Sequence, residues 1–176
     1  MRVQCAKVLK KRLAQLNSDE PYILIGDFNS NYEEYRTFIK SRKHNDTNGI
    51  TGINHILKTI DNDKNPITYT SLKSIDGFLY NLWYELPKEQ RWSHKFKQFK
   101  EGLDNIIISP ALADGKGLEY VRESFARFEE PYLFNKGKIY RWQQSRRYPK
   151  HHLGEGYSDH LPLYAKINFA KAHTNQ

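Results

Sequence analysis

Three short apolar runs, at 22–25, 106–108 and 163–167, have polar side chains capable of chemistry at one end. Their length and apolar character predict buried strands. The polar residues beside them form three pairs: Asp27 and Asn29, Asp104 and Asn105, and Asp159 and His160. Because strand ends hold side chains rigidly, several such ends can converge on one site.

The residue types in these pairs suit hydrolysis of a phosphodiester. A hard divalent cation needs carboxylate oxygens to hold it, and bound there it offsets the charge of a phosphate. A histidine held by a carboxylate can be cationic or neutral as a step requires. An asparagine amide can orient water or phosphate without adding negative charge. Taken singly, each pair also has a structural explanation as a turn, a helix cap or a surface loop.

The elements around these pairs predict a mixed α/β domain. Apolar residues at helical spacing predict an amphipathic helix over 2–16 with a basic outer face, and a shorter helix over 53–60. Asn31, followed three residues later by Glu34, predicts a capping box at the start of another helix. The order of strands and helices does not match a Rossmann alternation, and no glycine-rich phosphate loop occurs. This order of elements instead predicts a mixed sheet with long functional loops.

Composition and charge favour an ordered domain with an anionic partner. The 176 residues suit one domain, and 14% aromatic content argues against disorder. The net charge of +8 favours nucleic acid or anionic lipid headgroups, although it can also serve solubility alone. The single cysteine, Cys5, excludes an internal disulfide. No apolar stretch approaches a membrane span and no signal core opens the chain, which predicts a soluble protein of undetermined compartment.

Two segments, 88–100 and 131–154, are rich in both basic and aromatic residues and are expected to be exposed loops. Phosphate contacts from Lys and Arg combined with aromatic stacking suit DNA or RNA. The predicted substrate contacts are Lys97, Arg141, Arg146 and Arg147, with Trp92 and Trp142 as stacking candidates. A solvated insertion is the alternative. A lipid phosphodiesterase would instead need an exposed apolar hairpin, for which only 78–83 could serve.

Three motifs occur in the order ILIGDFN at 23–29, LDNIIIS at 103–109 and SDHLPL at 158–163. Together they resemble the last three motifs of the endonuclease/exonuclease/phosphatase superfamily, which includes deoxyribonucleases, apurinic endonucleases, sphingomyelinases and inositol phosphatases. The resemblance implies a deoxyribonuclease-like fold, a four-layer α/β sandwich with mixed, largely antiparallel sheets. It also implies divalent-metal chemistry, with Mg²⁺ or Mn²⁺ as the expected ion.

The resemblance further implies a role for each matching residue. Asp27 would position or activate the attacking water, and Asn29 would help hold the nucleophile and the scissile phosphate. His160 would bind the phosphate and stabilise its developing charge, with Asp104 orienting it. Asp159 would approach the metal, directly or through water. Asn105 is a small departure, since the family often has an apolar residue there.

The family's first motifs, including the glutamate that is its main metal ligand, have no match in this chain. We therefore expect 1–168 to be the C-terminal part of such a domain and 169–176 a polar tail. A complementary N-terminal fragment would be a partner, an export signal could lie in the missing part, and activity of the chain alone would be impaired. The predicted function is metal-dependent phosphodiester hydrolysis on DNA or RNA. The alternatives are a phosphatase or lipid phosphodiesterase, and an inactive or nucleic-acid-binding module.

Overall fold

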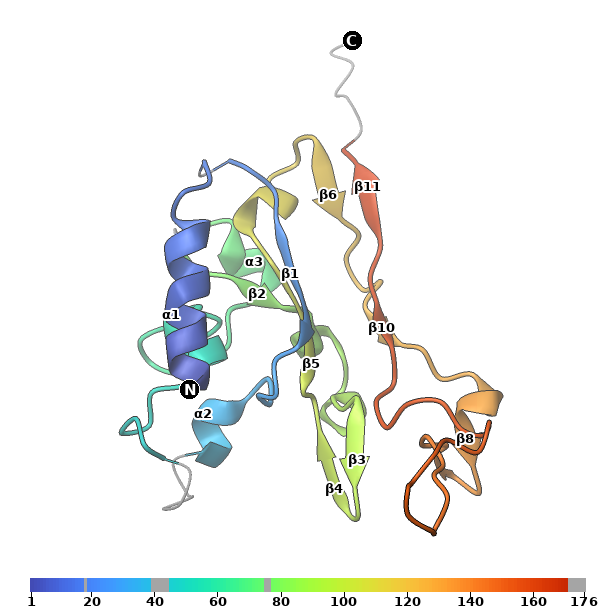
Figure 1. Ribbon diagram of the computed structural model, residues 1–176. Coiled ribbons are helices and arrows are strands. Elements are labelled where there is room, and N and C mark those ends of the chain that lie inside the picture. The colour runs from blue at the N-terminus through green and yellow to red at the C-terminus, as the bar shows by residue number, and fades with distance from the viewer. Residues whose placement is uncertain (18, 39–44, 75–76, 171–176) are drawn as a thin grey trace.

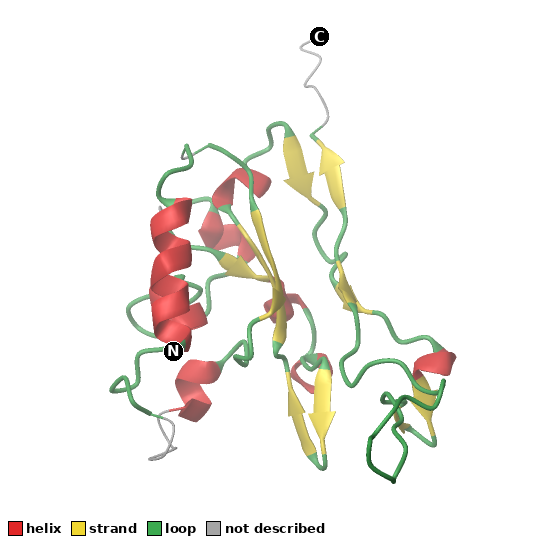
Figure 2. Ribbon diagram, in the orientation of Figure 1, coloured by secondary structure: helices red, strands yellow, loops and turns green. Residues whose placement is uncertain are grey.

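The computed structural model describes residues 1–17, 19–38, 45–74 and 77–170. These residues form a mixed α+β fold whose small sheets are antiparallel (Figure 2). The central sheet has the order β1-β5-β2, with bounds β1 (Ile23–Asp27), β5 (Asp104–Ile108) and β2 (Tyr80–Asn81). Its register pairs Asp27 with Asp104, so two predicted site carboxylates face each other across neighbouring strands.

The two faces of the central sheet pack against different layers. Leu24 and Ile107 lie on the face covered by helix α1 (Arg2–Leu13) and the π-helix η2 (Gly52–Ile56). Ile106 and Ile108 lie on the other face, in a core around Trp83. This split follows from the two-residue periodicity of a strand, which sends successive side chains to opposite faces. The long apolar run of β5 is therefore buried on both sides.

A second layer lies beside this core, on the side away from α1 (Figure 1). It contains β6 (Leu118–Tyr120) paired with β11 (Ile167–Phe169), and β7 (Ala126–Arg127) paired with β10 (Leu163–Tyr164). The predicted strand over 163–167 is thus two short strands. It splits because its pairing partners, β6 and β7, are separated by a turn, and Lys166 bonds to that turn at Val121 and Ser124.

The remaining elements are short, and two hairpins project from the same end of the molecule (Figure 1). These hairpins pair β3 (His94–Phe96) with β4 (Phe99–Glu101), and β8 (Phe134–Asn135) with β9 (Lys138–Ile139). The short helices are α2 (Glu34–Thr37), α3 (Tyr69–Leu72), η3 (Leu82–Glu85), η4 (Lys88–Gln90), η5 (Pro110–Leu112) and η6 (Pro131–Leu133). No helix in the described ranges has the length and apolar character that crossing a membrane requires.

Several local predictions were wrong in detail. Helix α1 ends at Leu13 rather than at residue 16, because the chain tightens there into i to i+3 hydrogen bonds. Asn31 does not cap α2, whose N-cap is Glu33 without a side-chain bond. The helix expected over 53–60 is the five-residue η2. Most of the expected polar tail, 171–176, lies outside the described residues.

The segments considered as exposed differ in burial. The segment 78–83, the one stretch that could have served as an exposed apolar hairpin, instead carries Leu79, Tyr80, Leu82 and Trp83 in the core. The segment 88–100 is exposed or half-buried, as predicted, except at one residue. Within 88–100, Ser93 is fully buried, because its backbone carbonyl accepts from the Leu161 amide and its hydroxyl contacts Asp104. The segment 131–154, in contrast, is largely exposed as predicted.

Strand β1 forms an edge of the central sheet. Two hydrogen bonds identify the side of β1 that pairs with β5: the Phe28 amide donates to the Leu103 carbonyl, and the Ser109 amide donates to the Tyr22 carbonyl. The alternation of an antiparallel ladder then turns the backbone groups of Ile23, Ile25 and Asp27 away from β5. The side chains of Ile23 and Ile25 are 40% and 67% exposed on this strand.

Candidate active site

Asp27 and Asn29 form a small structured turn where β1 ends. The Asn29 amide donates to Asp27 Oδ1 at 2.8 Å, and the Asn29 side-chain amide lies 3.4 Å from Oδ2. Asn29 has a φ of 48°, a left-handed conformation that asparagine tolerates better than most residues. The Asn29 carbonyl accepts from the Arg2 guanidinium of α1. The turn therefore fixes the Asp27 carboxylate relative to both the strand and the helix.

Asp27 and Asn29 also line a cavity of about 560 Å³ between β1 and α1. Its other walls are largely apolar and include Ala6 and Leu9 of α1. The cavity leaves one side of the Asp27–Asn29 turn accessible to a small ligand.

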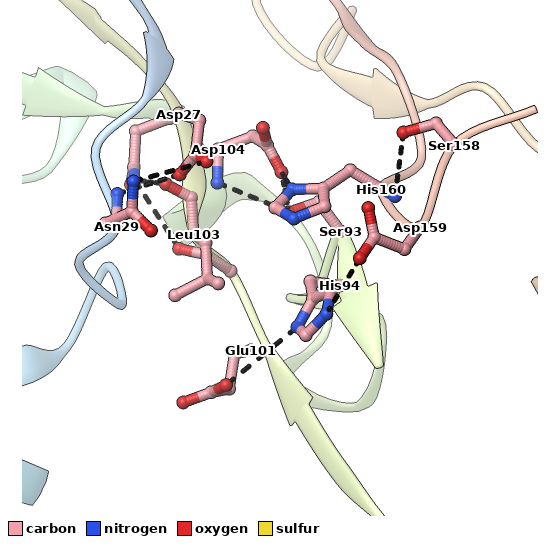
Figure 3. Close-up of polar contacts among 12 residues, drawn as sticks. Asp27, Asn29, Ser93, His94, Glu101, Leu103, Asp104, Ser158, Asp159 and His160 are labelled. Atoms are coloured by element: carbon pink, nitrogen blue, oxygen red, sulfur yellow. Dashed lines mark hydrogen bonds and ion pairs between the residues drawn. The ribbon is translucent and has the colours of Figure 1, made fainter. Parts of the chain in front are cut away.

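Asp104 and His160 form a hydrogen-bonded pair at the opposing strand end (Figure 3). His160 Nδ1 lies 2.7 Å from Asp104 Oδ2, and both side chains are about one-fifth exposed. The same carboxylate oxygen accepts from the Ser93 hydroxyl, and Trp83 Nε1 donates to the Asp104 carbonyl at 2.7 Å. An ionised Asp104 favours the proton on Nδ1, which leaves Nε2 of His160 as the ring nitrogen free for a ligand.

Asp159 lies on the other side of His160 and contacts Arg141 and His94. Arg141 Nη2 is 2.8 Å from Asp159 Oδ2, and His94 Nε2 is 3.9 Å from the same oxygen. Burial tends to raise the pKa of Asp159, but its own backbone amide and the charges of Arg141, His160 and His94 outweigh burial and lower this pKa below its ordinary value. Asp159 is therefore ionised over the whole neutral range.

The acidic and histidine side chains of the site thus fall into two groups that share His160. Asp27, Asp104 and His160 each have a ligand-type atom within 4.8 Å of the others, and so do His94, Asp159 and His160. The first group offers two carboxylates, which matches the oxygen preference of Mg²⁺ and Mn²⁺. The donor set therefore fits the expected divalent cation, although Asp159, the predicted metal ligand, belongs to the second group rather than the first.

Sequence reasoning missed Ser93 and His94. Ser93 lies directly before β3, and His94 is the first residue of β3 and bridges to the backbone of His160. The side chains of Ser93 and His94 reach Asp104 and Asp159 respectively. In the sequence they belong to a segment interpreted as an exposed basic loop. The available signal was a Ser-His dipeptide shortly before Asp104, since a hairpin between the two can return the chain to the same strand end.

Asn105 is more than a small departure. Its side chain is fully buried, accepts from Asn81 Nδ2 at 2.9 Å, and donates to the carbonyls of Ser30 at 3.2 Å and Leu103 at 2.9 Å. A further contact reaches the Gly102 carbonyl at 3.4 Å. Asn105 therefore joins the turn after β1 to the residues before Asp104, and an apolar residue could not make these bonds.

Four of the six predicted substrate-contact residues lie on the segment 131–154. Arg141 contacts Asp159 directly, and Arg146 and Arg147 are exposed on the same segment. The Trp142 ring is 48% exposed and stacks on His152 with centroids 5.3 Å apart.

The remaining two lie on or beside the β3–β4 hairpin. Trp92 is half-buried, with Lys100 and Arg127 over its ring at 4.8 and 4.5 Å. Lys97 occupies the hairpin turn. Trp142 is thus partly exposed with His152 stacked on its ring, whereas the Trp92 ring has two cations over it.

Comparison with known protein families decides the broader assignment. The model of the endonuclease/exonuclease/phosphatase family matches residues 1–169. This chain belongs to that family. The match confirms the resemblance and the fold class inferred from the three motifs, and it makes the chain a relative of phosphoesterases that generally use divalent metals. Neither the curated proteins nor the solved structures contained a significant match.

Proposed function

We propose that this chain hydrolyses phosphodiester bonds of DNA or RNA with the help of a divalent cation. One contact carries the proposal: the Arg141–Asp159 ion pair ties the cationic segment 131–154 to the residue next to His160. That segment contains no acidic residue and six Lys or Arg side chains. A polyanion bound along it would be held beside the Asp104–His160 pair.

The side chains support a division of labour around a scissile phosphate. His160, oriented by Asp104 at Nδ1, would present Nε2 to a phosphate oxygen and stabilise its developing charge. Asp27, fixed by the Asn29 amide, would orient or deprotonate the attacking water. Asn29 would donate its side-chain amide to the phosphate. A cation held by the carboxylates of Asp27 and Asp104 would supply charge neutralisation.

Nucleic acid is favoured as the substrate by the pairing of charge with open aromatic surface. Phosphate contacts from Arg141, Arg146 and Arg147 would give affinity without sequence preference. Base stacking on an aromatic face contributes about 1–3 kcal/mol per base, and Trp142 offers such a face. Binding should therefore weaken steeply with salt and lose a salt-independent part when Trp142 is replaced by Ala.

The decisive experiment is cleavage of plasmid DNA and of a labelled RNA in Mg²⁺ or Mn²⁺. We expect Asp27→Ala and His160→Ala each to lower the rate by about 10²–10⁴-fold, the contribution typical of a positioned acid–base group. Asp63→Ala, an exposed aspartate away from the site, serves as the matched control and should leave the rate unchanged. Cleavage that persists in either site variant would overturn the assignment. Salt-dependent binding without any cleavage would favour a nucleic-acid-binding module.

A lipid phosphodiesterase is the second candidate, and one observation favours it. The tip of the β3–β4 hairpin exposes Phe96 by 50% and Phe99 by 59%, next to Lys95, Lys97 and Lys100. Apolar side chains flanked by lysines are suited to the interface of an anionic bilayer. Turnover of sphingomyelin in anionic vesicles, with no cleavage of DNA or RNA, would decide for this candidate.

A further inference from the structure

His94, Asp159 and His160 bring three ligand-type atoms together at the base of the β3–β4 hairpin. Their atoms all lie within 4.8 Å of one another, and His94 Nε2 is 3.9 Å from Asp159 Oδ2. The two imidazole rings lie 4.7 Å apart between centroids (Figure 3). Two imidazoles and one carboxylate are a different donor set from the Asp27–Asp104 pair, because nitrogen predominates.

The backbone holds the two histidines in this relation. His94 and His160 form an antiparallel bridge, and the Leu161 amide donates to the Ser93 carbonyl at 2.8 Å. Both residues are therefore fixed on neighbouring extended segments rather than on a free loop. A preformed pair of ligands reduces the ordering cost of binding a third group.

Each histidine also has a carboxylate on its Nδ1 side. Asp104 lies 2.7 Å from Nδ1 of His160, and Glu101 lies 4.0 Å from Nδ1 of His94. The Nδ1 atom of His94 is buried and has no hydrogen-bond partner among the residues that the structure describes, so a small movement of the partly exposed Glu101 side chain would satisfy it. Metal-bound histidines commonly donate their second nitrogen to a carboxylate, which fixes the tautomer and leaves the other nitrogen for the ion.

We propose that His94, Asp159 and His160 form a binding site for a borderline divalent ion of the Zn²⁺ or Co²⁺ type. Tetrahedral bonds of about 2.0–2.2 Å place ligand atoms roughly 3.3–3.6 Å apart, and the 3.9 Å between His94 Nε2 and Asp159 Oδ2 is close to that separation. Imidazole donors favour such ions over Mg²⁺, which prefers oxygen ligands. The site goes beyond the proposed hydrolysis and does not depend on it, but both use Nε2 of His160, so an ion bound here would exclude the contact of that nitrogen with a phosphate oxygen.

Arg141 competes with the proposed ion for Asp159. Its guanidinium bonds the same Asp159 oxygen at 2.8 Å, from a side chain that is about half exposed. Ion and guanidinium cannot share that oxygen without strong repulsion, so binding of the ion must displace Arg141. Removal of the Arg141 charge should therefore tighten binding of the ion.

The test is a titration of the full chain, freed of metal by a chelator, with Co²⁺ followed by its visible absorption, and then competition by Zn²⁺. We expect a saturable Co²⁺ spectrum that Zn²⁺ abolishes and a large excess of Mg²⁺ does not. His94→Phe keeps a ring against His160 but removes both nitrogens, and it should weaken Co²⁺ affinity by at least 10-fold. Glu101→Gln should weaken it by about 10-fold through the lost orientation of His94, and Arg141→Gln should strengthen it.

His151→Ala, an exposed histidine outside the cluster, is the matched control and should change nothing. Circular dichroism of each variant separates loss of the site from loss of the fold. Absence of Co²⁺ binding by the folded wild-type chain would overturn the proposal. The same holds if folded His94→Phe binds Co²⁺ as tightly as wild type, or if Asp27→Ala alone abolishes binding, since the ion would then occupy the carboxylate pair. Each of these results leaves the cleavage experiment with Asp27→Ala and His160→Ala untouched.

Discussion

Replacement of Asn105 by Leu tests whether the buried amide organises the site. The two side chains have the same number of heavy atoms and both branch at Cγ, so the substitution removes hydrogen bonds while keeping the branched shape, and the methyl groups of Leu add some volume at this buried position. Asn105 is the second residue of β5, directly after Asp104, and it bonds across to Asn81 of β2 and to the turn that follows β1. If the amide is needed there, the variant should lose both stability and the arrangement of the Asp27 and Asp104 carboxylates.

The size of the loss follows from which partners keep another bond. The Leu103 carbonyl still accepts from the Phe28 amide, and the Gly102 carbonyl still accepts from the Tyr32 amide. Asn81 Nδ2 and the Ser30 carbonyl lose the side-chain partner that Asn105 supplies. A buried polar group left unpaired costs about 1–3 kcal/mol, so the two groups together predict a loss of about 2–6 kcal/mol. That is a large share of the roughly 5–15 kcal/mol that stabilises a typical domain.

Urea unfolding followed by tryptophan fluorescence measures this loss. With a slope of about 2 kcal/mol per molar urea, the midpoint should fall by about 1–3 M. Asn168→Leu is the matched control, because Asn168 is exposed on β11 and its side chain has no hydrogen bond to any described residue; it should change stability by less than about 0.5 kcal/mol. The double variant with Asn81→Leu should show coupling of about 0.5–3 kcal/mol. A loss below about 1 kcal/mol for Asn105→Leu, or no coupling with Asn81, would refute the reasoning.

Two further predictions concern Ser93 and Glu34. Ser93→Ala removes a hydroxyl that donates to Asp104, so we expect the free energy of unfolding to fall by about 1.5–3 kcal/mol, measured by urea unfolding. In steady-state kinetics kcat should fall with little change in KM. An unchanged kcat would show that His160 does not need the bond between Ser93 and Asp104. Burial raises the pKa of Glu34, opposed by the charge of Arg2. A raised folded-state pKa gives stability below the ordinary value of about 4.3 that is lost as pH rises through the folded-state value. Relative to Glu34→Gln, the wild type should therefore gain stability on acidification across this window, and a difference independent of pH in urea unfolding would contradict the assignment.

The three strands and their polar ends could be predicted from sequence because the signal for each lies in a few neighbouring residues. Short apolar runs next to Asp27, Asp104 and His160 identify strands and the polar ends of those strands, and the order of the runs identifies the family. The antiparallel register that sets Asp27 against Asp104 extends the same logic, since two adjacent strands with polar ends at matched positions bring those ends together. The fold class followed from these motifs through the family.

Tertiary structure alone decided which residues surround these strand ends. The segment containing Ser93 and His94 has the composition of an exposed loop, yet a backbone bridge to His160 places both against the site. Asparagine is typical of turns, yet the Asn105 side chain is buried in a strand and two of its partners, Asn81 and Ser30, come from other elements. Composition reports the average environment of a segment, whereas the burial of one side chain depends on which distant segment packs over it. For this protein that packing determines which groups hold Asp104, Asp159 and His160 in place.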